Sequence, residues 1–272
     1  LPAPIGMHTV SRDNLYRGEP QLQAYCEKLV DDNHMKLGGP FMPIANNQYS
    51  ISPPGPAGGV NFWGGTYDPK LNLIYYGTSN PSPWSAGVRG NDSSDIGQYS
   101  NLHTASVLAI NPDNGSIQWH YQFTPNDAYD YDSNWEMILA EIPYQNGRRK
   151  VLMQMNRNGF LYVLDRADGK LLSAEPFEKV NWASHVDLKT GRPVETEVAK
   201  KLRNGEQIEH WPSTAGGKNW PHASFNPETG LLYANTIHQG RLYKHLPTEE
   251  HKVGQRYMFI ENVALPKPPG EP

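Results

Sequence analysis

Short alternating runs of apolar and polar residues, separated by turn-forming residues, run through most of the chain. TYDPKLNLIYYGT (residues 66–78) and SFNPETGLLYANT (residues 224–236) each place an Asx-Pro turn before an apolar run. A related form, in which an apolar strand leads into a turn that opens with Asx and closes with Gly, recurs at Asn111, Asp165 and Asp187. The pattern predicts antiparallel hairpins at irregular intervals.

Helical periodicity is scarce. Residues 19–33, EPQLQAYCEKLVDDN, place Leu22, Tyr25, Cys26 and Leu29 at the i, i+3, i+4, i+7 spacing of one helix face. The sequence therefore predicts one helix at 19–33 and little helix elsewhere.

Recurrent hairpins indicate an all-β fold, either a β-propeller of four-stranded antiparallel blades or a β-sandwich. Three long segments have no clean strand pattern, at residues 81–103, 124–136 and 196–222. Long loops on a repeat scaffold are usually functional. We expect an irregular, partly helical segment at 1–57, propeller blades at 58–260 and a Pro-rich tail at 261–272.

Composition narrows the classes of partner. The net charge is −4, which disfavours nucleic acid. The sequence contains no apolar run of roughly 18 residues, so no membrane span is expected. The opening LPAPIGMHTV does not have the form of a signal peptide. Cys26 is the single cysteine, so an intramolecular disulfide is excluded within this sequence.

Three carboxylates crowd the segment TPNDAYDYDSN (residues 124–134). Asp127, Asp130 and Asp132 occur there without any Lys or Arg. Like charges held this close repel unless a positive group sits among them. Residues 130 and 132 lie on the same side of an extended segment, so both carboxylates can reach one cation. Hard cations prefer such oxygen ligands, and the segment therefore predicts a metal site.

Five motifs occur in an order that is specific to one family: YDPKLNLIYYGTSNPSPW, TPNDAYDYDSN, NRNGFLYVLDRADGK, VNWASHVDLKTGRPVE and GGKNW. From about Gly58 to about Ala234 the chain resembles the quinoprotein methanol and ethanol dehydrogenases, which depend on pyrroloquinoline quinone (PQQ). The resemblance implies an eight-bladed propeller with PQQ and a metal ion in its central channel, which oxidises a primary alcohol to an aldehyde. The match lies in the middle of longer family chains, so we expect this chain to supply only part of the propeller.

The resemblance assigns the metal ligands. Asn80 matches the amide ligand, and Asp130 matches the catalytic base beside the metal. Asp132 matches an extra aspartate that resembles the lanthanide-dependent branch, so a lanthanide is favoured and calcium is the alternative. The alternative roles are an Asx-turn before Pro for Asn80, a solvated loop acid for Asp130, and a turn or outer-sphere residue for Asp132.

The resemblance also assigns cofactor contacts. Arg157 matches a basic residue at the PQQ carbonyl oxygens, and Asn219 with Trp220 matches a polar and aromatic pair beside the cofactor. The stacking position falls on Phe62 or on Trp63. Lys218 is a further candidate charge near the cofactor, and Trp84 and Trp119 are interpreted as packing between blades.

Departures from the family pattern leave alternatives open. The family's cysteine-pair disulfide cannot form, and the upstream Glu ligand has no match in residues 1–57. A second chain that completes the propeller is therefore one of the expected partners. No CxxCH haem motif occurs, which implies a separate electron acceptor such as a c-type cytochrome; the family implies a periplasmic location. A catalytically silent propeller scaffold, or a PQQ dehydrogenase of sugars or polyols, remains as an alternative function.

Overall fold

The computed structural model describes residues 20–38, 50–51, 59, 64–81, 84, 101–246 and 260–265. The chain divides into two compact units, Leu1–Gly59 with His251–Gln255 and Val60–Glu250 with Arg256–Pro272. The expected division at 1–57, 58–260 and 261–272 stays a prediction.

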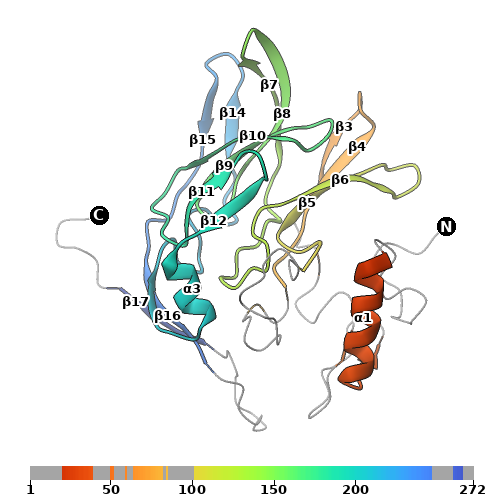
Figure 1. Ribbon diagram of the computed structural model, residues 1–272. Coiled ribbons are helices and arrows are strands. Elements are labelled where there is room, and N and C mark those ends of the chain that lie inside the picture. Colours follow the sequence, from red (N-terminus) through yellow and green to blue (C-terminus); the bar gives the residue numbers. More distant parts are fainter. Residues whose placement is uncertain are drawn as a thin grey trace. The chain divides into compact units, whose positions relative to one another are not determined.

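The first unit contains the predicted helix. Helix α1 spans Pro20–Asp32 (Figure 1), inside the predicted range of residues 19–33. Strand β1 (Lys36–Leu37) pairs in parallel with β2 (Ser50–Ile51). None of the described helices is long and apolar enough to cross a membrane.

The second unit is built mainly from antiparallel strands (Figure 1). One four-stranded sheet contains, in chain order, β3 (Thr66–Asp68), β4 (Leu73–Gly77), β5 (Ser106–Ile110) and β6 (Ile117–Gln122). A second contains β7 (Ile138–Tyr144), β8 (Gly147–Met155), β9 (Phe160–Asp165) and β10 (Leu171–Pro176). The smaller sheets pair β11 (Ala183–Asp187) with β12 (Arg192–Glu195), β14 (Ser224–Asn226) with β15 (Leu231–Tyr233), and β16 (Arg241–His245) with β13 (Ile208–His210) and β17 (Ile260–Ala264). Four-stranded antiparallel blades are therefore confirmed.

The predicted hairpins close with one kind of turn. At Asn111, Asp165 and Asp187, and also at Asn226, the backbone carbonyl accepts a hydrogen bond from a glycine N–H four residues later, at 2.7–2.9 Å. Each Asx Oδ1 also accepts the N–H two residues on, again at 2.7–2.9 Å. The closing glycines have φ between +68° and +75°, a conformation that L-residues with a side chain rarely adopt. Each turn is therefore determined by residues within the turn itself, the Asx that opens it and the Gly that closes it.

The two four-stranded sheets pack face to face. Tyr75 and Val107 of the first sheet share a core with Leu152 and Leu164 of the second. Trp119 of β6 lies against the turn after β9: a Cβ on Gly169 would come 2.5 Å from its Cε3 atom. This contact joins the two sheets, as expected for the blade-to-blade role of Trp119. Trp84 instead stacks on Tyr243 of β16, with ring centroids 5.8 Å apart.

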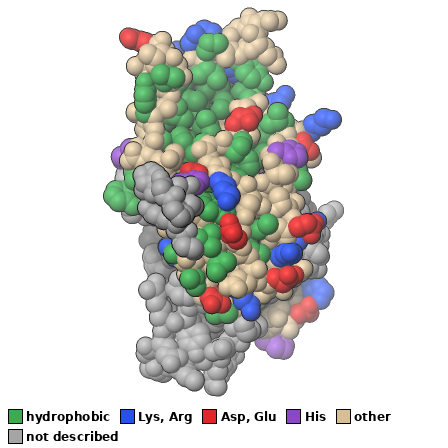
Figure 2. All heavy atoms as spheres, turned by 90° about the vertical axis from the view of Figure 1, so that its left-hand side faces the viewer, with side chains coloured by type: hydrophobic (Ala, Val, Ile, Leu, Met, Phe, Trp, Pro, Cys, Tyr) green, Lys and Arg blue, Asp and Glu red, His purple; other side chains and the backbone are tan. Residues whose placement is uncertain are grey.

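The opposite face of the second sheet carries another apolar cluster. Val151, Met153 and Val163 belong to it, and Phe225 of β14 packs against it. The central sheet is thus covered on both faces, as in a propeller. Figure 2 shows hydrophobic side chains gathered in the upper part of the face that carries β14 and β15, where Leu231 and Tyr233 are each 53 % exposed.

Residues 196–222 were expected to form a loop, and that expectation is wrong for part of the segment. It contains β13 and helix α3 (Glu197–Arg203), which buries Ala199 and Leu202. The helix is too short to give a periodic signal. Its other sequence signals are Thr196 at the N-cap, an acidic first turn and a basic last turn.

Candidate active site

The segment that joins β6 to β7 is irregular and yet buried. Asp127, Ala128, Tyr129 and Tyr131 have no exposed surface, and Thr124 is 1 % exposed. A solvated acidic loop would look different, because charged side chains are rarely buried without partners. The segment is therefore not a solvated loop, although the Asp130 side chain itself is 27 % exposed.

Asp127 organises the segment from within. Its Oδ1 accepts the N–H of Tyr129 at 2.9 Å, and its Oδ2 accepts the N–H of Tyr131 at 2.8 Å. The two backbone donors are satisfied without a sheet partner. This assigns Asp127 the turn-capping role and leaves Asp130 and Asp132 as the acids that face other groups.

Asn80 reaches the segment because the chain after β4 runs directly beside it. The N–H of Ser133 donates to the carbonyl of Thr78 at 3.0 Å, and the N–H of Asn80 donates to Oδ1 of Asp132 at 2.9 Å. Gly77 permits this approach, since a Cβ there would lie 1.9 Å from the carbonyl oxygen of Ser133. Residues 52 positions apart in sequence are thereby brought together.

Arg157 supplies the positive charge that residues 124–134 do not contain. It lies in the turn between β8 and β9 and is 9 % exposed. Its Nη1 donates to Oδ2 of Asp132 at 2.7 Å, and its Nη2 donates to Oδ2 of Asp130 at 3.1 Å. Both carboxylates therefore face one cation, although Asp130 has a left-handed backbone with φ +68° rather than a regular strand conformation.

The carbonyl of Thr214 holds the guanidinium in place. It accepts hydrogen bonds from Nε of Arg157 at 2.8 Å and from Nη2. Gly216 makes room for the arginine, because a Cβ there would lie 2.1 Å from its Cγ. Sequence reasoning missed Thr214, because a main-chain carbonyl carries no residue-type signal.

Burial dominates the electrostatics of Asp130. It raises the pKa of the Asp130 carboxyl to about 7, the neighbouring Arg157 lowers it, and Asp132 and Asp127 raise it further. A carboxyl with a pKa near neutrality can accept a proton at physiological pH. Left-handed backbone at a residue with a side chain is uncommon and often occurs at functional sites.

The oxygen donors fit a hard metal ion. The carboxylates of Asp130 and Asp132 converge on one cationic group, and Asn80 lies against Asp132 through its backbone N–H. Carboxylate and amide oxygens are the ligands that such ions prefer. Among the described residues, no group of three or more His, Cys, Asp or Glu side chains could hold a metal. The side-chain Nδ2 of Asn80 donates to the carbonyl of Pro81 at 3.3 Å, so the role of the Asn80 amide as a ligand stays a prediction.

The expected cofactor contacts are only partly brought together. Asn219 donates from Nδ2 to the carbonyl of Ala215 at 2.7 Å, in the same segment that holds Arg157, and Trp220 is 59 % exposed. Lys218 is directed elsewhere: its Nζ pairs with Glu136 at 3.0 Å, and its side chain is 1 % exposed. Phe62 and Trp63 lie outside the described residues.

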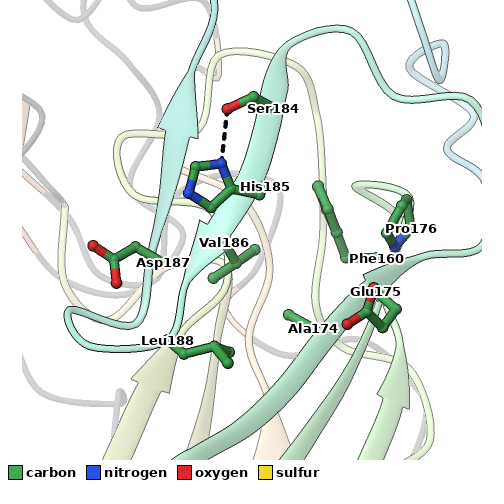
Figure 3. A pocket seen from close by; sticks show the side chains of 9 residues that line it. All are labelled: Phe160, Ala174, Glu175, Pro176, Ser184, His185, Val186, Asp187 and Leu188. Atoms are coloured by element: carbon green, nitrogen blue, oxygen red, sulfur yellow. Dashed lines mark hydrogen bonds between the residues drawn. The ribbon is translucent and has the colours of Figure 1, made fainter.

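A separate groove lies between β10 and β11 (Figure 3). Its volume is about 420 Å³, and Phe160, Ala174 and Val186 supply apolar walls. Ser184 Oγ and His185 Nδ1 form a 3.0 Å hydrogen bond at one end. None of its lining residues is a predicted site residue, so the groove is distinct from the carboxylate site.

Comparisons with known proteins agree with the geometry. The family profile "PQQ: Glucose/ethanol/alcohol dehydrogenase, beta-propeller domain" matches residues 2–99 and 66–181. Quinohemoprotein alcohol dehydrogenase ADH IIB of Pseudomonas putida is 44 % identical over 214 residues, which cover 79 % of this chain and 27 % of that protein. The lanthanide-dependent methanol dehydrogenase of Methylacidiphilum fumariolicum strain SolV is 41 % identical over 66 % of this chain and 28 % of its own length.

Solved structures give the same result. Quinohemoprotein alcohol dehydrogenase ADHIIG of Pseudomonas putida HK5 superimposes with a TM-score of 0.64 at 41 % identity, over 72 % of this chain and 28 % of that one. The chain thus spans about a quarter to a third of the length of the relatives it matches.

Proposed function

The chain belongs to the β-propeller family of PQQ-dependent glucose/ethanol/alcohol dehydrogenases, and we propose that it carries the catalytic base and part of the metal and cofactor site of an enzyme that oxidises a primary alcohol to an aldehyde. One observation carries the proposal: Asp130 and Asp132 face a single cation from a buried loop, at 3.1 and 2.7 Å from Arg157. Because the chain spans only part of its relatives, the remaining ligands come from residues outside it.

Asn80, Asp130 and Asp132 would hold the metal ion, and a lanthanide is favoured over calcium. The argument is one of charge: Asp132 adds a second carboxylate, and an added negative charge attracts a trivalent ion more strongly than a divalent one. The Methylacidiphilum relative is named a lanthanide-dependent methanol dehydrogenase, which is consistent with this choice. When bound, PQQ supplies the two-electron acceptor, and the metal ion supplies a Lewis acid.

Asp130 is the proposed general base. Its carboxylate accepts the hydroxyl proton of the alcohol as the substrate gives up a hydride equivalent. In the metal-free protein, burial raises the pKa of the Asp130 carboxyl to about 7, which suits a group that must take up and release a proton. Asp132 orients the site through its contacts with Asn80 and Arg157.

Arg157 is the proposed clamp for PQQ, which is a tricarboxylate. A guanidinium has five donors in a planar fork, and Arg157 uses four of them on Asp130, Asp132 and the carbonyl of Thr214. One Nη1–H remains to bind a further oxygen. Asn219 and Trp220 are proposed to line the cofactor from the segment that also holds Arg157, and Phe62 or Trp63 to stack on the ring.

Completion of the propeller requires further strands. β15 pairs with β14 alone among the described strands, whereas β4, at the corresponding place in the first sheet, pairs with β3 on one side and β5 on the other. We propose that residues beyond this sequence or a second chain cover the exposed apolar face at β14 and β15 and supply the missing Glu ligand.

Electrons are proposed to leave to a separate acceptor such as a c-type cytochrome. A haem domain of the same protein is the alternative, because the ADH IIB relative is named a quinohemoprotein. A periplasmic location is proposed on the family resemblance.

The deciding experiment adds calcium or lanthanum to metal-free protein with PQQ and measures alcohol oxidation and PQQ absorbance. We expect lanthanum to support activity in the wild type, and Asp132→Ala to remove that response. Asp168→Ala, in an exposed turn, is the matched control. Activity with calcium and none with lanthanum would reverse the choice of metal, and a lanthanum response retained by Asp132→Ala would remove Asp132 from the ligands.

The same assay separates the competing functions. Protein that binds no PQQ with any metal is a silent scaffold, which the missing Glu and disulfide favour. Bound PQQ with turnover of sugars or polyols but not of primary alcohols would assign the chain to that other class of dehydrogenase.

A further inference from the structure

Tyr131 lies between the two carboxylates in sequence, and its side chain packs in an aromatic cluster. It has no exposed surface and sits in a cluster with Tyr129, Trp182 and His210. Its hydroxyl has two polar neighbours, His210 Nε2 at 2.8 Å and the carbonyl of Pro212 at 2.5 Å. The cluster therefore holds a hydrogen-bonded polar group in its interior.

The direction of these hydrogen bonds follows from which of the groups carry a proton to donate. A tyrosine hydroxyl has one proton, and a carbonyl only accepts. Tyr131 therefore donates to Pro212, and His210 donates from Nε2 to the Tyr131 oxygen. This tautomer leaves Nδ1 of His210 without a proton, and Nδ1 has no hydrogen-bond partner in the described structure. Burial, with a smaller effect from His245, lowers the pKa of His210 to about 3, so the ring is neutral as this assignment requires.

Pro212 connects this hydrogen bond to the cation. Two residues after it, the carbonyl of Thr214 accepts from Arg157, the guanidinium that Asp130 and Asp132 face. The loop with the carboxylates and the segment that holds the guanidinium are thus joined twice, at the charged groups and through the Tyr131 hydroxyl. The hydrogen bond from Tyr131 to Pro212 can therefore set the distance between the carboxylates and the guanidinium.

We propose that Tyr131 is a positioning residue, whose hydroxyl, held between His210 and Pro212, sets the spacing at which Asp130 and Asp132 meet Arg157 and receive the metal ion. The metal part rests on the function proposed above. The spacing of the carboxylates and the guanidinium rests on the contacts alone and can be tested without metal.

The chain offers a matched control two residues away. Tyr129 is in the same loop, has no exposed surface, and stacks on the same His210 ring with centroids 4.8 Å apart. Its hydroxyl has no hydrogen-bond partner in the described structure. Tyr129→Phe removes an unpaired hydroxyl, whereas Tyr131→Phe leaves the Nε2–H of His210 and the carbonyl of Pro212 unpaired.

A second control separates positioning from loss of stability. Tyr162 has no exposed surface, and its hydroxyl accepts from Asn158 Nδ2 at 2.9 Å and donates to the carbonyl of Phe123 at 3.3 Å. Tyr162→Phe also breaks two buried hydrogen bonds, and neither of these bonds involves the carboxylates, Pro212 or Arg157. It should lower stability without changing the site.

The primary measurement uses the full chain without metal. The urea midpoints of Tyr131→Phe, Asp132→Asn and the double variant form one cycle, and the same cycle is made with Tyr129→Phe and with Tyr162→Phe. We expect the midpoint shifts of Tyr131→Phe and Asp132→Asn to be non-additive, and the two control cycles to be additive. An additive Tyr131 cycle, or control cycles that are equally non-additive, overturns the proposal.

The second measurement is titration of the metal-free chain with terbium, followed by its aromatic-sensitised luminescence. We expect Tyr131→Phe to weaken terbium binding by about tenfold or more, in line with residues that orient metal ligands, and both controls to stay near the wild type. Equal affinity in Tyr131→Phe and the wild type overturns the proposed effect on the metal. A wild-type chain that binds no terbium contradicts the proposed metal site instead, and the midpoint cycle then decides the positioning role.

Discussion

Asp187, which ends β11 and opens the turn to β12, and Asp130, in the loop after β6, have opposite electrostatic environments. The backbone N–H groups of Lys189 and Thr190 hold the pKa of Asp187 below its ordinary value. Burial raises the pKa of Asp130 to about 7, against the effect of Arg157. Backbone donors stabilise the charged form of a carboxyl, and removal of water disfavours it. The residue type alone therefore says nothing about the protonation chemistry of these two positions.

Asp127 stands between these two cases. Like Asp187 it accepts backbone N–H groups, and like Asp130 it is buried in the loop after β6. Its hydrogen bonds shape the loop, and that shape directs the next two acids toward Arg157. The turns and the loop thus use the same Asx-to-backbone bond, but only the loop holds further carboxylates in place.

Removal of the proton acceptor should have the largest effect. Asp130→Asn is nearly isosteric, but the amide cannot take the alcohol proton, so we expect alcohol oxidation to fall on the order of a hundredfold or more. Turnover is measured with PQQ and metal added, and circular dichroism checks the fold. Asp187→Asn, in the exposed turn, should retain turnover. Near-normal activity of Asp130→Asn would move the base elsewhere, with Asp132 the next candidate, because both oxygens of Asp127 accept backbone N–H groups.

The turns can be tested at their closing glycines. In Gly169→Ala the new residue must adopt a positive φ, and its Cβ would lie 2.5 Å from the Trp119 ring. We therefore expect the free energy of unfolding to fall by roughly 2–3 kcal/mol, from backbone strain and overpacking. Gly230→Ala, with φ +70° and no atom within 4 Å of the new Cβ, should lose only about 1 kcal/mol. Urea unfolding measures both. Equal losses would show that the Trp119 contact does not join the sheets tightly.

The hairpins could be predicted from sequence because their determinants lie within five residues. Asn111, Asp165 and Asp187 each open a turn that its own glycine closes. The pairing of Arg157 with Asp130 and Asp132 could not be predicted in this way, because the partners lie 25 and 27 residues apart. Family resemblance assigned roles to all three, but their geometry depends on Asp127, Gly77 and the main chain at Thr214.

The capping role of Asp127 predicts a stability change that Asp187 should not share. Asp127 uses both carboxylate oxygens, one for each backbone N–H. In Asp127→Asn an NH₂ group would face one of these donors, and we expect a loss of about 1–3 kcal/mol. Asp187 accepts both of its backbone donors through Oδ1 alone, so Asp187→Asn should change little. The comparison is made by urea unfolding, and equal midpoints for the two variants would contradict it.

The smallest expected effect is a pH dependence of stability. The folded pKa of Asp130, about 7, lies above its ordinary value of 3.8, so between these values the folded protein binds more protons than the unfolded chain. Its contribution to stability is fully present below about pH 4 and is lost as the pH rises through about 7. We expect a loss on the order of 1 kcal/mol, because the Asp130 side chain is 27 % exposed and solvent screens it.

Asp130→Asn isolates that contribution from other titrating groups. The unfolding free energy of the metal-free wild type and of the variant is measured from about pH 4 to about pH 8. The difference between the two curves should shift in favour of the variant as the pH rises, because the amide has no charge to bury. His210 contributes in the opposite direction, since its lowered pKa makes stability fall as the pH drops, but it does so equally in both proteins and cancels. A difference that stays constant across this range would mean that Asp130 is ionised throughout, and the loop would then hold it as the turn holds Asp187.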